Sequence, residues 1–166
     1  MSPDEQRPLD RSVSRVADLR RRGLLGPCSV VASDAEFEDL VRAVAAQPHV
    51  RTVAVTDEDG RLAGIIPIRA FYGALLADVY PEALMGEVAS VGGALDIADH
   101  IVHPTAGEIM LASESVALAD TLHDAFIALR RSGHTGLPVV DEDDRPVGYL
   151  DLLAILPLWE QRPTRE

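Results

Sequence analysis

The side chains best suited to chemistry lie near the middle of the chain, at Asp96, Asp99, His100 and His103. Their spacing places all four on one face of a helix, where carboxylates and imidazoles could hold a divalent metal ion. The same spacing also fits the polar face of a linker helix over Ala94–Val102, so both interpretations stay open.

Two further segments could contact an anion. His134 and Thr135 offer an imidazole and a hydroxyl, although this loop could also exist only because Gly133 and Gly136 allow its backbone to turn. The only basic cluster, 20–22 (Arg-Arg-Arg), could draw an anionic partner or pair with the acidic body of the protein.

The sequence contains no recognisable catalytic set. It has no lysine, and it lacks a phosphate loop, a GxSxG elbow and an HExxH helix. Cys28 is the single cysteine, which excludes an internal disulfide and a CxxC metal site, and we expect it to be a buried small apolar residue. We therefore expect a protein that is not an enzyme.

Composition limits the partners. The formal net charge is −12, which disfavours nucleic acid and anionic membrane surfaces, while 47% hydrophobic residues suffice for a globular core. The N-terminus lacks the apolar stretch of a signal peptide, and a lone cysteine fits a reducing compartment. We expect a cytoplasmic protein.

An internal repeat organises the chain. The segments Thr52–Ala70 and Gly136–Ala154 align without a gap at a shift of 84 residues. Seven residues of the first copy recur in the second: Val55, Asp57, Glu58, Asp59, Arg61, Gly64 and Ala70 match Val139, Asp141, Glu142, Asp143, Arg145, Gly148 and Ala154. Upstream, at a shift of 85, both copies carry apolar residues at the i, i+3, i+4 and i+7 positions of an amphipathic helix.

Each copy predicts the order strand, helix, strand, strand, helix. The predicted strands are Ser29–Ala32, Thr52–Thr56 and Leu62–Ile66 in the first copy, and Ser115–Ala117, Gly136–Val140 and Pro146–Leu150 in the second. Asp34 and Asp120 are the predicted caps of the first helices. The second helices are predicted at Ile68–Leu76 and Leu152–Trp159. Acidic turns at 57–60 and 141–144 are expected to be solvated hairpin turns, since Gly60 comes too early for a calcium loop.

This pattern divides the chain into five parts. We expect an N-terminal segment with a short helix (1–27), a first repeat (28–77), a helical linker (78–110), a second repeat (111–160) and a tail (161–166). The linker is expected to hold helices at Pro81–Ser90 and Ala94–Val102, separated by Gly92 and Gly93.

The segment GHTGLPVVDEDDRPVGYLDLLAIL resembles the second half of a cystathionine-β-synthase (CBS) domain, and VRTVAVTDEDGRLAGIIPIRAF resembles a weaker first copy. The resemblance implies an α/β (α+β) fold in which two βαββα repeats pair with pseudo-twofold symmetry. It also implies a homodimer and clefts that bind AMP, ATP or S-adenosylmethionine. A module of this family would regulate a protein partner.

The resemblance also implies which residues face such a cleft. They are Thr52, Val53, Pro67, Arg69, His134, Thr135, Gly136, Leu137, Pro138 and Asp151. Nucleotide-binding members end the third strand with a hydroxyl residue for phosphate and, three residues later, an Asp for ribose. Here Pro67 and Asp151 replace the hydroxyl and Ala70 and Ala154 replace the Asp, so we expect weak adenosine binding. Asp151 would repel a phosphate unless a cation such as Mg²⁺ bridges the two.

Three functions therefore remain. The first is a stand-alone CBS-pair module that senses a small ligand. The second is a dimeric scaffold that binds no ligand and acts through protein partners. The third is a divalent-cation sensor that uses the acidic surface. Residues 67–71 followed by 91–95 are also similar to the CBS region of some magnesium transporters, which indicates a sub-family only.

Overall fold

The computed structural model describes residues 14–47, 51–71, 105–112 and 114–156, and it divides the chain into two compact units. The repeat 1 unit is Ser29–Ala112, and the repeat 2 unit combines Met1–Cys28 with Ser113–Glu166. The predicted linker helices, the Asp96–His103 cluster and the tail lie outside the described residues. Within these residues, no helix is long and apolar enough to cross a membrane.

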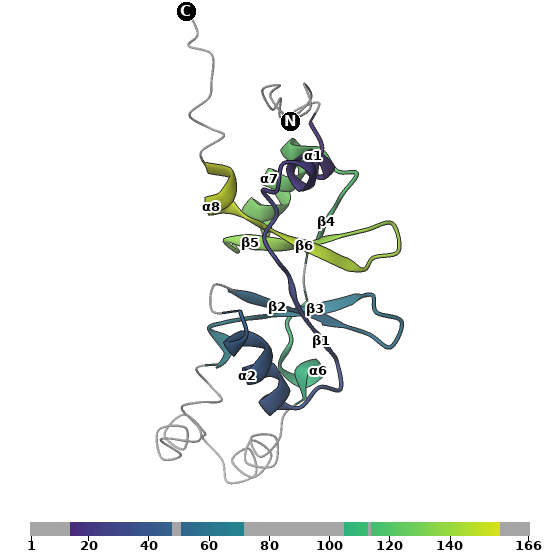
Figure 1. The fold of residues 1–166 in the computed structure, drawn as a ribbon, viewed down its shortest axis with the longest axis vertical. Helices are drawn as coiled ribbons and strands as arrows, with labels where there is room; N and C mark the ends of the chain where they lie inside the picture. The colour runs from purple at the N-terminus through teal and green to yellow at the C-terminus, as the bar shows by residue number, and fades with distance from the viewer. Residues whose placement is uncertain (1–13, 48–50, 72–104, 113, 157–166) are drawn as a thin grey trace, which may run out of the picture. The chain divides into compact units, whose positions relative to one another are not determined.

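The repeat 1 unit contains a three-stranded sheet in the order β1–β2–β3 (Figure 1). Its strands are β1 (Ser29–Ala32), β2 (Thr52–Thr56) and β3 (Leu62–Pro67); β1 is parallel to β2, and β3 is antiparallel. Helices α2 (Phe37–Ala45) and α6 (Ala106–Ile109) cover one face, and their apolar residues enclose a core with Val53, Val55 and Ile66.

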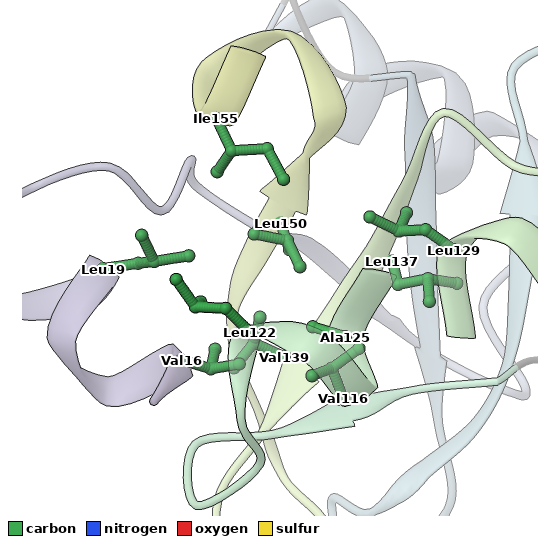
Figure 2. Close-up of a cluster of buried hydrophobic side chains, with 10 residues drawn as sticks. All are labelled: Val16, Leu19, Val116, Leu122, Ala125, Leu129, Leu137, Val139, Leu150 and Ile155. Carbon is green, nitrogen blue, oxygen red and sulfur yellow. The ribbon is translucent and has the colours of Figure 1, made fainter. Parts of the chain in front are cut away.

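The repeat 2 unit repeats this topology with strands β4 (Val116–Ala117), β5 (Gly136–Val140) and β6 (Pro146–Asp151). Helices α1 (Val16–Arg21), α7 (Leu122–Ser132) and α8 (Leu152–Ile155) lie over one face of the sheet. Figure 2 shows the core that they form with it, in which Leu19 of α1 and Leu150 of β6 meet the apolar side of α7. The strand–helix–strand–strand order is confirmed, and so are the predicted strands, with β3, β4 and β6 each differing by one residue at one end.

The hairpin turns in both units are built by one aspartate each. In the first turn Asp57 Oδ1 accepts hydrogen bonds from the backbone N–H groups of Asp59 and Arg61, and in the second Asp141 Oδ1 accepts them from Asp143 and Arg145. The carboxylates at the head of each turn are therefore occupied by backbone donors. This matches the predicted hairpin turns and leaves the calcium-loop interpretation without support.

Segments from outside each repeat complete its sheet. In the repeat 1 unit, Leu111 exchanges two backbone hydrogen bonds with Ile65 of β3, at 2.8 and 3.0 Å. In the repeat 2 unit, Gly26 makes the same exchange with Tyr149 of β6, at 2.9 and 3.0 Å. Ile65 and Tyr149 are equivalent positions at the 84-residue shift, so the two units close their third strand in the same way.

The short helices α6 and α1 occupy equivalent places as well. Ala106 and Gly107 donate to the carbonyls of Ala35 and Ser33. In the second unit, the backbone N–H groups at 16 and 17 donate to the carbonyls at 120 and 118. The helix that precedes repeat 1 in the sequence is thus packed in the core of repeat 2.

This docking explains why the predicted helix caps are wrong. The turns that contain Asp34 and Asp120 supply carbonyls to α6 and α1, so the first helices begin later. Helix α2 has Glu36 at its N-cap, with no side-chain hydrogen bond, and α7 is capped by Thr121, whose hydroxyl accepts from the Asp124 N–H at 3.2 Å. The Asp120 carboxylate instead accepts from the Ala117 N–H.

We predict that Leu19→Ala destabilises repeat 2 and leaves repeat 1 intact, although Leu19 precedes repeat 1 in the sequence. The side chain is fully buried, and truncating a buried leucine costs about 2–4 kcal/mol. Hydrogen exchange should show lost protection in 114–156 and unchanged protection in β1–β3. Arg20→Ala, at an exposed position of the same helix, is the control. Loss of protection confined to residues 29–71 would contradict the assignment of α1.

Candidate functional site: the strand ends of the two repeats

The ten predicted ligand-binding residues fall into two groups, one in each unit. The first group comprises Thr52, Val53, Pro67 and Arg69, and the second comprises His134, Thr135, Gly136, Leu137, Pro138 and Asp151. Each group lies where the middle strand of a sheet begins and the third strand ends, because Thr52 pairs with Pro67 and Gly136 pairs with Asp151. We call these places the repeat 1 strand end and the repeat 2 strand end.

The same backbone hydrogen bond holds both strand ends. The Ile68 N–H donates to the Arg51 carbonyl, and the Leu152 N–H donates to the Thr135 carbonyl, each at 2.9 Å. These bonds fix the residues that flank the strands, and side chains then decide what each end can bind.

Two of the predicted residues offer only their backbone. The side chains of Val53 and Leu137 are 1% and 0% exposed and belong to the hydrophobic cores of their units. Thr52, Gly136 and Pro138 lie on the opposite faces of the same strands, since neighbouring strand residues alternate.

Pro138 stands in the middle strand of its sheet, where a proline removes a donor. Tyr149, its partner on β6, directs its own N–H and C=O to Gly26, so it makes no ladder bond with Pro138. On the other side, β4 is only two residues long and pairs with Val139 and Val140. Pro138 therefore lies beyond the pairing of β4 with β5, whereas Ala54, the equivalent residue of repeat 1, pairs with Val30 of the longer β1.

The repeat 2 strand end carries a carboxylate that is already engaged. Asp151 is the N-cap of α8, and its Oδ1 accepts from the Leu153 N–H at 2.9 Å. This cap stabilises the first turn of the helix and holds a negative charge beside Gly136. His134, which is partly buried, is fixed through its backbone N–H on the Ser132 hydroxyl at 3.2 Å.

The ring of Tyr149 covers the Cα of Gly136, a contact that the sequence did not reveal. A Cβ at position 136 would lie 2.5 Å from the Tyr149 ring and 2.6 Å from the Leu150 carbonyl oxygen. Glycine is required there because the neighbours are a buried ring and a backbone oxygen. Only the alignment of Tyr149 with Ile65 of the other copy could have drawn attention to it.

The repeat 1 strand end has the opposite charge. Arg51 and Arg69 are both exposed, and neither forms an ion pair within the described part of the chain. The equivalent residues in repeat 2 are Thr135 and Leu153, so this pair of cations exists in only one copy. Sequence reasoning included Arg69 and missed Arg51, which the alignment places directly before Thr52.

Cys28 offers no reactive thiolate. Burial raises the pKa of its thiol to about 11, so the group is protonated at neutral pH. Among the described residues, no group of three or more histidine, cysteine or acidic side chains is arranged to hold a metal ion.

Two βαββ repeats with equivalent strand ends define a tandem-repeat protein, and comparison with known proteins gives its family. The family model described as CBS domain matches residues 16–77 and 106–158. The chain belongs to the CBS domain family and has the fold of a CBS domain pair.

Solved structures agree with this assignment. A CBS domain-containing protein from Thermotoga maritima is 28% identical with a TM-score of 0.64, and the match covers 91% of this chain and 98% of that one. The CBS domain of a membrane protein from Sphaerobacter thermophilus is 21% identical (TM-score 0.60), with 87% and 86% covered. A Pyrobaculum aerophilum CBS domain protein complexed with AMP is 18% identical (TM-score 0.60), with 86% and 91% covered. No curated protein matches the sequence significantly.

We predict that Gly136→Ala destabilises the repeat 2 unit by about 1–3 kcal/mol, because the new methyl group must displace the Tyr149 ring and meets a backbone oxygen. Gly26→Ala is the matched control. Its Cβ would lie 3.7 Å from the Tyr149 carbonyl oxygen, an ordinary contact, and we expect a change within about 0.5 kcal/mol. Urea denaturation of both variants measures the difference, and equal midpoints would show that the ring does not enforce glycine.

Proposed function

We propose that this chain is a regulatory module that binds a small ligand at the strand ends of its CBS repeats, with an adenosine-type ligand held weakly. The observation that carries the proposal is the pair of equivalent strand ends, each of which places polar or charged residues beside a tightly paired backbone. A relative of the same fold is complexed with AMP, which makes adenine nucleotides the first ligands to test.

Regulation without catalysis follows from the chemistry of these ends. They offer hydroxyl, imidazole, guanidinium and carboxylate groups, but the carboxylate of Asp151 is engaged in a helix cap and the chain contains no lysine. These groups suit the binding of an anion or a polar ring. They do not form a nucleophile and base pair of the kind that transfer reactions need.

Weak binding follows from two alanines at the positions where nucleotide-binding relatives carry a ribose carboxylate. Ala70 packs partly against the core of repeat 1, and Ala154 lies within α8. A methyl group cannot accept hydrogen bonds from ribose, and losing a charge-assisted hydrogen bond costs about 1.5–3 kcal/mol.

Calorimetry with AMP tests this proposal. We predict that Ala70→Asp binds AMP about tenfold or more tightly than the unmodified protein, because the new carboxylate accepts the ribose hydroxyls. Ala63→Asp, at an exposed position of β3, adds the same charge away from the strand end and is the control. Melting curves of both variants check that each is folded. Tight AMP binding by the unmodified protein, unchanged in Ala70→Asp, would contradict the weak-binding proposal.

We also propose that the module acts as a homodimer. Large apolar side chains remain exposed where the second helices begin, with Ile68 at 42%, Leu153 at 53% and Leu156 at 48%. Leu153 of α8 and Leu156 at its C-cap are one turn apart, and exposed leucines at this spacing are typical of a surface that a partner covers.

Light scattering should show a dimer at micromolar concentration, and Leu153→Glu combined with Leu156→Glu should convert it to a monomer, because buried charges oppose association. Val30→Glu alters a residue of similar exposure on β1 and should leave the dimer intact. A monomeric unmodified protein would refute the homodimer.

A further inference from the structure

The two strand ends have the same backbone hydrogen bonding, but their side chains differ in charge. At the repeat 1 strand end, Arg51 and Arg69 flank the buried pair Thr52 and Pro67, and the Ile68 N–H bonded to the Arg51 carbonyl holds the two basic positions on adjacent segments. Exposed like charges repel each other, so an anion between them would be stabilised by both guanidinium groups.

The repeat 2 strand end offers an imidazole and a hydroxyl at His134 and Thr135, but two other features disfavour an anion there. Asp151 stands where repeat 1 has Pro67, and its carboxylate is held in place by the Leu153 N–H. The Tyr149 ring lies over Gly136, where repeat 1 has Thr52. A phosphate there would meet a fixed negative charge and an aromatic ring, and the position equivalent to Arg69 is a leucine.

We propose that the repeat 1 strand end alone binds the anionic group of the ligand, through Arg51 and Arg69, with one anion per chain and no need for a metal ion. This inference rests on the proposed ligand-sensing function and adds to it the ligand's charge, the repeat that recognises it and the stoichiometry. The chain as a whole has a net charge of −12, so two neighbouring exposed cations offer an anion a local attraction against a net repulsion.

Arg51 and Arg69 are not among the residues that recur in both repeats. Arg61 and Arg145 occupy equivalent positions in the two hairpin turns, and the turns use only their backbone groups. Arg51 and Arg69 have no basic counterpart in repeat 2. The hairpin arginines therefore provide matched controls for a general loss of positive charge.

The test uses the full chain and calorimetry with three probes, AMP, adenosine and inorganic pyrophosphate, in chelator and in Mg²⁺. For the unmodified protein we expect AMP to bind more tightly than adenosine, at one site per chain, in chelator. Arg51→Gln and Arg69→Gln should each weaken AMP binding about tenfold, and the double variant should bind AMP no better than adenosine. The double variant Arg61→Gln with Arg145→Gln should bind AMP as the unmodified protein does.

The other outcomes separate this inference from the proposed function. If AMP binds and the Arg51/Arg69 double variant binds it equally well, or if two AMP bind per chain, the inference is wrong and ligand sensing stands. If AMP binds only with Mg²⁺, the inference is wrong and Asp151 is the phosphate position. If pyrophosphate binds and is lost in the double variant while neither AMP nor adenosine binds, the anion site stands and the adenosine ligand is refuted. If AMP and adenosine bind equally well, the inference is wrong and ligand sensing stands. If no probe binds, both are refuted.

Discussion

The structure depends on how the backbone of the third strand in each sheet is paired on its outer side, a pairing that we call the closure of the sheet. A three-stranded sheet leaves the backbone groups of its outer strands unpaired, and unpaired groups are costly when they are buried. Here Leu111 and Gly26, each from a segment outside the repeat whose sheet it completes, satisfy one residue of a third strand with two hydrogen bonds. The short helices that precede them then reach the cores, and they set where α2 and α7 can begin. The places of α6 and α1 in the two cores accompany this pairing.

The closure also explains how two copies of one unit can differ in chemistry. The ladder, the hairpin turn and the bond between the residues flanking the strands use backbone atoms or an aspartate that both copies possess. The side chains at the strand ends take no part in these shared hydrogen bonds. Arg51 can therefore stand where the other copy has Thr135, and Pro67 where it has Asp151, without a change of fold.

Membership of the CBS domain family establishes the fold of the chain, while its function has to be argued from the strand ends. One end presents two exposed cations, and the other presents a capped carboxylate beside a glycine covered by an aromatic ring. This asymmetry is a property of this sequence.

The sequence by itself determined the strands, the hairpin turns and the repeat. The bounds Ser29–Ala32, Thr52–Thr56 and Gly136–Val140 were predicted as they occur, because short apolar runs between turn signals carry their information locally. Alignment of the two copies also indicated the strand ends and their missing ribose carboxylates. These features depend on residues that are close together in the chain or related by one fixed shift.

Only the tertiary structure decided the features that join distant segments. Asp34 and Asp120 are good helix caps by residue type, but the carbonyls of their turns receive α6 and α1, and the helices begin beyond them. Helix α1 belongs to the core of repeat 2 although it precedes repeat 1. The Tyr149 ring excludes any side chain at position 136, thirteen residues away. In each case the outcome depends on packing and hydrogen bonds between parts of the chain that no local pattern relates.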